Sequence, residues 1–272
     1  MKNLECYCVL MSLYYKEKPE YLDECLTSLS KQTILPSQTV IVYDGIVSES
    51  LNAVVYKWLS ILNIVVVPLK KNVGLGNALN EGLKYCKYDL VGRMDTDDIC
   101  VPERFEQQIA EFVADPKLVV HSGYIAEYDN LMEHQTGFRK VPLSSEEIVR
   151  FCKKKNPFNH MAVMFRKNII EKLGGYRHHL FMEDYNLWIR LLSAGYKGKN
   201  TNAILVRARA GNAMLARRKG LTYIKSEWQI TKLKNDVGLT NKFEGISIFF
   251  IRSLPRLLPT SVLKFVYAKI RS

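Results

Sequence analysis

The sequence is poor in the features that mark secreted, zinc-binding and membrane-spanning proteins. Its six cysteines include no Cys-x-x-Cys pair and no finger-like Cys/His spacing, which argues against a disulfide framework or a structural zinc site. The opening residues MKNLECYC place Glu5 where a signal peptide needs apolar residues. The longest apolar candidate, residues 246–251, is far shorter than the roughly 18–20 residues that a spanning helix requires. These absences predict a reduced, cytosolic protein.

Internal repeats and low-complexity tracts are also absent, and 272 residues with 47% hydrophobic composition can bury a substantial core. The net charge of +12 is concentrated near one end of the chain. Residues 205–272 contain 14 Lys and Arg against 3 Asp and Glu, whereas residues 1–204 contain 25 against 24. This basic quarter predicts contact with phosphate, an acidic membrane surface or nucleic acid, with ordinary solvated charge as the alternative.

Apolar runs alternate with segments of helical periodicity along the first half of the chain. The predicted strands cover residues 6–13, 40–43, 64–69, 90–94 and 118–126. Short connections between such elements predict an α/β fold with a mostly parallel, Rossmann-like sheet that helices cover on both faces. Ligands bind such sheets at the carboxyl ends of the strands, where Asp44, the turn at residues 72–77 and Asp95 all fall.

Three carboxylates follow the fourth predicted strand, in the segment DLVGRMDTDDICVP at residues 89–102. Asp95, Asp97 and Asp98 would repel one another unless a cation or protonation relieved the repulsion. A cluster of this kind can hold a divalent cation against a phosphorylated substrate. The alternative is that Asp97 or Asp98 caps a helix beginning near Pro102, which would explain one carboxylate rather than three.

A series of motifs in order resembles the family 2 glycosyltransferases, which have the GT-A fold, and within them the bacterial enzymes that build O-antigen and exopolysaccharide repeat units. The motifs, spread over residues 6–220, are VLMSLYY, SLSKQT, VIVYDG, NVGLGNALNEG, GRMDTDD with PERF, and GGY with MEDYNLWIRLL. Each is weak alone, but their order and spacing are specific. The resemblance implies a GT-A catalytic domain at residues 1–220, with a nucleotide-sugar-binding half at 1–130 and an acceptor-binding half at 131–220.

The resemblance also implies roles for residues of the first half. Asp44 matches the aspartate that accepts a hydrogen bond from uracil, although Tyr43-Asp44-Gly45 departs from the usual Asp-Asp-Gly. Asp97 matches the ligand of Mn²⁺ or Mg²⁺ that bridges the UDP diphosphate. The other residues that it assigns to nucleotide-sugar binding are Ser12, Tyr14, Asn72, Gly74, Arg93 and Asp95.

A second carboxylate pair, Glu183-Asp184, matches the catalytic base motif of the family. An inverting transfer needs a carboxylate to take the proton from the acceptor hydroxyl as its oxygen attacks C1 of the donor sugar. Asp184 is the predicted base, with Glu183 as its supporting or acceptor-binding neighbour. The pair also suits the acidic first turn of a helix that carries Leu187, Trp188 and Leu191, and both interpretations can hold.

Four further residues are candidates for diphosphate or acceptor binding. His160 lies in NPFNHMAVMF, where it either lines the acceptor side or serves as a structural histidine. Arg209, Arg217 and Arg218 fall in RARAGNAMLARRKG, where related enzymes carry a basic loop, and guanidinium groups suit diphosphate oxygens. These phosphates would belong to UDP or to a polyprenyl-diphosphate acceptor.

Residues 221–272 form the predicted basic, amphipathic C-terminal helical extension. Pro255 and Pro259 interrupt its second half, which predicts one or two short helices lying in a membrane interface. The alternative is a helix packed on the catalytic domain.

The predicted function is therefore transfer of a hexose from a UDP-sugar to a polyprenyl-diphosphate-linked saccharide, forming a β linkage in O-antigen, lipopolysaccharide or exopolysaccharide biosynthesis. The enzyme is expected to be metal-dependent and peripheral on the cytoplasmic face of the inner membrane. One alternative is a sugar nucleotidyltransferase, although its glycine-rich loop and basic signature after the first strand are missing. The other is a nucleic-acid-binding protein, which the apolar setting of the C-terminal aromatic residues disfavours.

Overall fold

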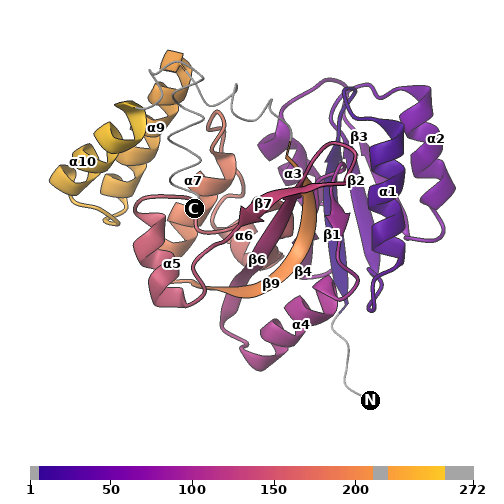
Figure 1. Ribbon diagram of the computed structural model, residues 1–272, viewed down its shortest axis with the longest axis horizontal. Helices are drawn as coiled ribbons and strands as arrows, with labels where there is room; N and C mark the ends of the chain where they lie inside the picture. Colours follow the sequence, from indigo (N-terminus) through magenta and orange to yellow (C-terminus); the bar gives the residue numbers. More distant parts are fainter. Residues whose placement is uncertain (1–5, 211–219, 255–272) are drawn as a thin grey trace.

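The computed structural model describes residues 6–210 and 220–254. In these residues one sheet contains nine strands in the order β3-β2-β1-β4-β8-β6-β9-β5, with β7 paired to β6 (Figure 1). The strands are β1 (Tyr7–Leu13), β2 (Gln38–Tyr43), β3 (Ile64–Pro68), β4 (Leu90–Arg93), β5 (Ile99–Cys100), β6 (Leu118–Tyr128), β7 (Gln135–Arg139), β8 (Met164–Arg166) and β9 (Lys197–Arg209). The α-helices are α1 (Pro19–Ser30), α2 (Glu49–Trp58), α3 (Leu75–Leu83), α4 (Arg104–Ala114), α5 (Ser145–Cys152), α6 (Lys167–Lys172), α7 (Glu183–Ser193), α9 (Gly220–Asp236) and α10 (Lys242–Ser253).

Strands β3, β2, β1 and β4 are neighbours in the sheet and are parallel to one another. Their carboxyl ends therefore meet along one edge, as predicted from the alternating strands and helices. The sheet becomes mixed beyond β4, because β8 is antiparallel to both β4 and β6, while β6 and β9 are parallel. The predicted α/β fold is thus confirmed, with its parallel strands concentrated in the first half of the chain.

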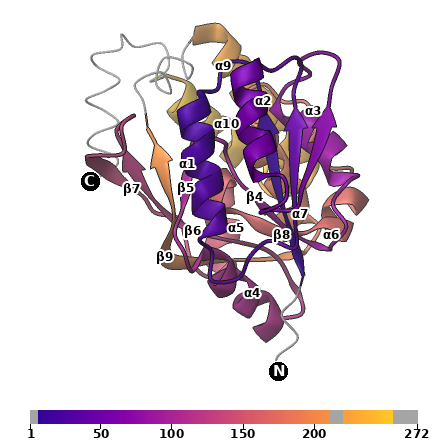
Figure 2. The same cartoon turned by 90° about the vertical axis from the view of Figure 1, so that its right-hand side faces the viewer.

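Alternate residues of β1 feed two hydrophobic cores, because successive side chains of a strand point to opposite faces of the sheet. Cys8 and Leu10 pack on the face covered by α3 and α7. Tyr7, Val9 and Met11 pack on the opposite face, where α1, α2 and α4 contribute the partners. Figure 2 shows α1 and α2 side by side in front of the strands. This double cover holds the strand ends in fixed positions.

Two helices follow the sheet at the end of the described chain. Helix α9 packs on α7, and α10 packs on α9 at the end of the molecule opposite α1 and α2 (Figure 1). The alternative of a C-terminal helix packed on the catalytic domain is thus met as far as Leu254, whereas residues 255–272 lie outside the described residues. Among the described residues, every helix is too short or too polar to cross a membrane. All six cysteines fall in the described ranges and are free thiols.

The segment after Asp98 differs from the prediction. A two-residue strand, β5, follows Asp98 directly and pairs with β9, and α4 begins only at Arg104 with Glu103 as its N-cap residue. The prediction that Asp97 or Asp98 caps this helix is therefore wrong. Two residues are too few for hydrophobic alternation to show, so the sequence pattern could not predict β5.

Candidate active site

A compact cluster forms where β2 ends beside the turn that leads into α3. The Asp44 carboxylate is buried and accepts hydrogen bonds from Val73 N (2.6 Å), Gly74 N (3.1 Å) and Asn72 Nδ2 (3.0 Å). Gly45 has φ +91°, and a Cβ there would lie 2.8 Å from Asn72 N, so this close approach requires glycine. The structure thus brings together Asp44, Asn72 and Gly74, which the sequence assigns to one nucleotide pocket.

Ser12 and Tyr14 lie at the neighbouring strand end. Ser12 is partly buried near the end of β1, in register with Val42 of β2. Tyr14 follows the strand with 40% of its surface exposed, and its ring lies 5.9 Å from that of Tyr15. Both side chains occupy the edge that carries Asp44, and their contact with a nucleotide stays a prediction.

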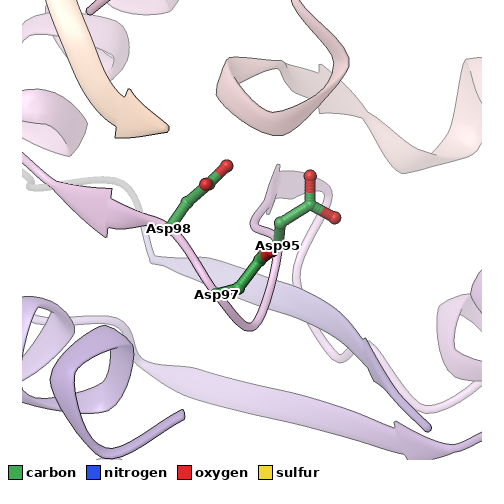
Figure 3. A group of neighbouring side chains, drawn as sticks. All are labelled: Asp95, Asp97 and Asp98. Carbon is green, nitrogen blue, oxygen red and sulfur yellow. The ribbon is translucent and has the colours of Figure 1, made fainter. Parts of the chain in front are cut away.

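The three aspartates lie on the loop between β4 and β5, and Figure 3 shows their side chains rising from one loop. One carboxylate oxygen from each of Asp95, Asp97 and Asp98 lies within 4.8 Å of the others. Burial, together with the charges of Asp95 and Glu17, raises the pKa of Asp97 to about 7. Burial, followed by Asp95 and Asp97, also raises the pKa of Asp98.

Carboxylates that repel one another in a partly buried loop suit a divalent cation, because the cation replaces the missing solvation and lowers these pKa values. Asp95 and Asp97 are partly exposed, whereas Asp98 is buried and accepts a hydrogen bond from the backbone N–H of Arg209 (3.0 Å). The donor set therefore fits a cation reached through Asp97 and Asp95. Asp98 instead connects the loop to β9.

Arg93 lies at the end of β4, directly before this loop. Its side chain is 3% exposed, and Nη2 forms an ion pair with Asp95 Oδ1. Nε and Nη1 are buried without a hydrogen-bond partner. Unpaired buried guanidinium donors are costly, so they are well suited to receive oxygens from a ligand.

Arg209, predicted to contact a diphosphate, lies under the aspartate loop. Its guanidinium bonds Glu24, the Asp97 carbonyl and the Asn130 carbonyl, and it stacks on the Tyr21 ring at 4.0 Å. In this arrangement Arg209 supports the loop, and direct phosphate contact stays a prediction. Arg217 and Arg218, also predicted for phosphate or acceptor binding, lie outside the described residues.

Glu183 and Asp184 form the acidic first turn of α7, as predicted. Asp184 is partly exposed and accepts hydrogen bonds from Asn156 Nδ2 (2.6 Å) and Tyr185 N (2.8 Å). Burial raises the pKa of Asp184, while these two bonds and the charges of Arg139 and Arg93 oppose the rise. Burial likewise raises the pKa of Glu183. A partly exposed carboxylate with a raised pKa suits a general base.

Hydrogen bonds join the loop before α7 to helix α3, on the donor side of the molecule. The Asn80 side chain donates to Tyr176 O (2.7 Å) and accepts from Tyr176 N (2.8 Å). A Cβ on Gly76 would lie 3.2 Å from Glu183 Cγ, so α3 passes close to the two carboxylates Glu183 and Asp184. Helix α3 and the loop before α7, which are far apart in sequence, therefore lie close together.

His160 contacts the side chain of Tyr176. Its Nε2 is 2.9 Å from the Tyr176 hydroxyl, and burial lowers its pKa well below the usual range. A neutral His160 thus positions the Tyr176 ring. Burial raises the pKa of Tyr176, the charge of Arg93 opposes this rise, and the charges of Asp184 and Asp95 add to it. An acceptor contact by His160 stays a prediction.

The sequence analysis assigned no role to three residues of the site. Glu17 accepts a hydrogen bond from the Thr96 hydroxyl and adds a fourth carboxylate near Asp97. Asn156 binds the predicted base, and Tyr176 lies between the two carboxylate groups. Tyr176 and Asn156 lie in the segments GGY and NPFNHMAVMF, which sequence analysis singled out for other reasons, whereas Glu17 carries no local signal.

Comparison with known proteins agrees with this geometry. Residues 8–174 match the family described as glycosyl transferase family 2. The amylovoran biosynthesis glycosyltransferase AmsE of Erwinia amylovora is 48% identical over 97% of this chain and 99% of its own length. The UDP-Gal:alpha-D-GlcNAc-diphosphoundecaprenol beta-1,3-galactosyltransferase of Escherichia coli is 36% identical over 97% of this chain and 96% of its own.

A similar fold occurs in the crystal structure of residues 1–349 of S. aureus TarS in complex with UDP-GlcNAc. The TM-score is 0.68 at 19% identity, covering 91% of this chain and 73% of that one. The present chain spans 43% of a longer TarS chain. This likeness concerns the fold.

Proposed function

The chain belongs to glycosyl transferase family 2, and from that membership we propose that it transfers a hexose from a UDP-sugar to a polyprenyl-diphosphate-linked saccharide. The reaction inverts the donor anomer and forms a β linkage during O-antigen or exopolysaccharide biosynthesis. The observation that carries this proposal is the pairing of an aspartate loop on the donor side with a partly exposed, hydrogen-bonded carboxylate on α7. The full-length similarity to the E. coli galactosyltransferase supports the choice of donor and acceptor class.

The proposed chemistry assigns one role to each carboxylate group. Asp184 accepts the proton of the acceptor hydroxyl while that oxygen forms a bond to C1 of the sugar and the bond from C1 to the diphosphate oxygen breaks. Glu183 lines the acceptor side of the same helix turn. UDP leaves with the bonding electrons, so the sugar ends on the acceptor oxygen with inverted configuration.

Asp97, with Asp95 beside it, would hold Mn²⁺ or Mg²⁺, which when bound supplies Lewis-acid stabilisation of the departing diphosphate. Arg93, whose Nε and Nη1 have no hydrogen-bond partner in the protein, would donate to oxygens of the sugar donor. Asp44, Asn72 and Gly74 shape the base and ribose pocket, with Ser12 and Tyr14 at its wall. The clustering of the first three supports this assignment.

The acceptor lipid places this reaction at a membrane surface. We assign the enzyme to the cytoplasmic face of the inner membrane, held there by its basic C-terminal segment at residues 221–272. The excess of 14 basic over 3 acidic residues from position 205 onward supports this assignment. The family membership argues against the sugar nucleotidyltransferase and nucleic-acid-binding alternatives.

A donor screen tests the proposal. The purified protein should consume UDP-sugars in preference to GDP- and dTDP-sugars when Mn²⁺ is present, and should transfer the sugar to an α-GlcNAc-diphosphate lipid. UDP-galactose is the first donor to try because of the 36% identical relative. The anomeric proton coupling of the product reports the linkage: an α-linked product from an α-linked donor would contradict the inverting mechanism, and pyrophosphate release would point to a nucleotidyltransferase.

A further inference from the structure

Helix α10 carries an apolar stripe on its outward face rather than on its inward face. The exposed side chains recur at spacings of three and four residues, which places them on one side of a helix. They are Phe243 (85% exposed), Ile246 (44%), Phe250 (53%), Ile251 (72%) and Leu254 (59%), the last of which directly follows α10. We call these five residues the α10 stripe. A contiguous exposed apolar stripe of this kind marks an interaction site.

The orientation of α10 is fixed by its inward face. A Cβ on Gly245 would lie 2.6 Å from the Asn235 side chain, so the helix packs tightly against the end of α9. Arg252 forms a bidentate pair with buried Glu227 (2.6 and 2.7 Å) and donates to the Lys154 carbonyl. Rotating the stripe inward would break these contacts, so the stripe is a stable outward feature of the fold.

Basic side chains border the α10 stripe. Lys153, at the end of α5, pairs with Glu244 of α10 at 3.3 Å, and the next two residues, Lys154 and Lys155, are exposed. Arg150 and Lys154 line a shallow hollow of about 590 Å³ together with apolar residues that include Val141 and Phe151. An apolar stripe bordered by lysines combines the two features that bind anionic bilayers.

From this arrangement we infer that the α10 stripe and the basic end of α5 dock on an anionic lipid bilayer. The stripe enters the interface while Lys153, Lys154 and Lys155 contact lipid phosphates. A second copy of the chain is a poor occupant, because an isologous contact would bring two basic rims together. Residues 255–272 are a poor occupant for the same reason, since they carry four basic residues and no acidic one.

This inference rests on the proposed function and adds an orientation to it. Asn156 directly follows the three lysines and donates to Asp184, the proposed base, at 2.6 Å. Docking through α10 and the end of α5 therefore places the segment that orients the base next to the docking surface. A diphosphate at the membrane surface would then lie close to the acceptor side of the site, where its attached saccharide can reach Asp184.

Vesicle binding by the full-length protein tests the docking surface. Trp228 is 51% exposed on α9 and contacts Phe249 of α10, whereas Trp58 and Trp188 are buried, so fluorescence quenching by brominated lipids reports on this face. Wild-type protein should bind vesicles containing phosphatidylglycerol and should bind pure phosphatidylcholine much more weakly. Ile251→Glu should weaken binding by at least about tenfold, because it removes a large apolar side chain from the interface and adds a like charge.

The matched control is Ile61→Glu, which changes an isoleucine of similar exposure (57%) beyond the end of α2 on the opposite side of the molecule. It should bind anionic vesicles like wild type. Equal binding of wild type and Ile251→Glu would overturn the inference. So would a wild-type dimer that does not bind vesicles and that Ile251→Glu converts to a monomer.

A transfer assay separates this inference from the proposed function. Ile251→Glu should keep wild-type activity on a short-chain acceptor dispersed in detergent and lose most of its activity on the same saccharide embedded in vesicles. Loss of both activities would overturn the docking role, because it would show damage to the site itself. If the wild type transfers sugar to neither acceptor while still binding vesicles, the proposed function fails and the docking surface stands.

Discussion

The two sides of the proposed active site are built from different kinds of contacts. On the donor side, Asp44 and the Asp95–Asp98 loop each follow a parallel strand directly, so the backbone of the sheet delivers them to one edge. On the acceptor side, Asp184 stands on a helix and depends on Asn156, 28 residues away in the sequence, for its orientation. Sheet topology thus positions the residues of the donor side, whereas tertiary packing positions those of the acceptor side.

This difference has an electrostatic counterpart. The donor side concentrates carboxylates whose repulsion favours a cation. On the acceptor side, Asp184 accepts two hydrogen bonds, which oppose the rise of its pKa that burial causes. Substitutions on the donor side should therefore weaken donor binding, whereas substitutions on the acceptor side should lower turnover.

The largest expected effect is on the donor side. Asp97→Ala should lower kcat/KM by about 10⁴-fold and abolish Mn²⁺-dependent binding of UDP, because it removes the proposed metal ligand. Calorimetry with UDP, with and without Mn²⁺, measures the binding loss. Asp236→Ala, which changes an exposed carboxylate on α9, is the matched control and should bind like wild type. If Asp97→Ala still binds UDP in a Mn²⁺-dependent manner, the metal assignment is wrong.

The second effect is on the acceptor side. Asp184→Asn should lower kcat by about 10³-fold while leaving UDP-sugar binding intact, because an amide cannot accept the proton. Glu183→Gln should lose much less. Near-full activity of Asp184→Asn would contradict the assignment of the base.

Thermal unfolding controls for damage to the fold. The folded-state pKa of Asp184 is raised, so stability falls as pH rises from the ordinary carboxyl pKa to the folded-state pKa, and the full cost persists at higher pH. Asp184→Asn removes this cost and should melt no lower than wild type at neutral pH. A large drop in Tm would mean that its lost activity reflects unfolding.

The pH dependence sharpens the comparison further. Asn156→Ala removes a donor that lowers the pKa of Asp184, so the acid limb of the kcat/KM profile should move to higher pH. The rate on that limb should fall roughly tenfold, while the plateau at higher pH changes little. Asn168→Ala, at an exposed asparagine of α6, should leave the profile unchanged. An unshifted acid limb in Asn156→Ala would show that Asp184 does not control it.

The sequence predicted the positions of the proposed donor-side residues in the fold because the signals for them are local. Strand periodicity placed Asp44 and Asp95 at strand ends, and the segment at residues 72–77 showed the glycine turn that Asp44 binds. Helix periodicity placed Glu183 and Asp184 at the start of α7. The sequence could not predict the partners of these residues, since the contact of Asn156 with Asp184 depends on how a loop packs on α7. The support of the aspartate loop by Arg209 depends on where the distant strand β9 lies in the sheet.

The C-terminal region illustrates the same limit. Composition predicted a basic, amphipathic extension, yet it could not decide which face of the helix at residues 242–253 would be buried. Gly245 and Arg252 decide that face through contacts with Asn235 and Glu227. A pattern of apolar residues therefore predicted a helix but not the direction in which its apolar side points.

The smallest expected effect concerns the contact that joins the two sides. Asn80 bonds both backbone groups of Tyr176, so Asn80→Ala should lower the free energy of unfolding by about 1–3 kcal/mol. It should also raise the acceptor KM more than the donor KM, because the loop before α7 loses its tie to α3 while the Asp44 cluster is untouched. Asn77→Ala, one turn earlier in α3, removes an exposed bond to Val73 O and should change stability by less than about 0.5 kcal/mol. Equal effects of the two variants, measured by denaturant unfolding and by steady-state kinetics, would mean that the donor and acceptor sides are held together by the sheet alone.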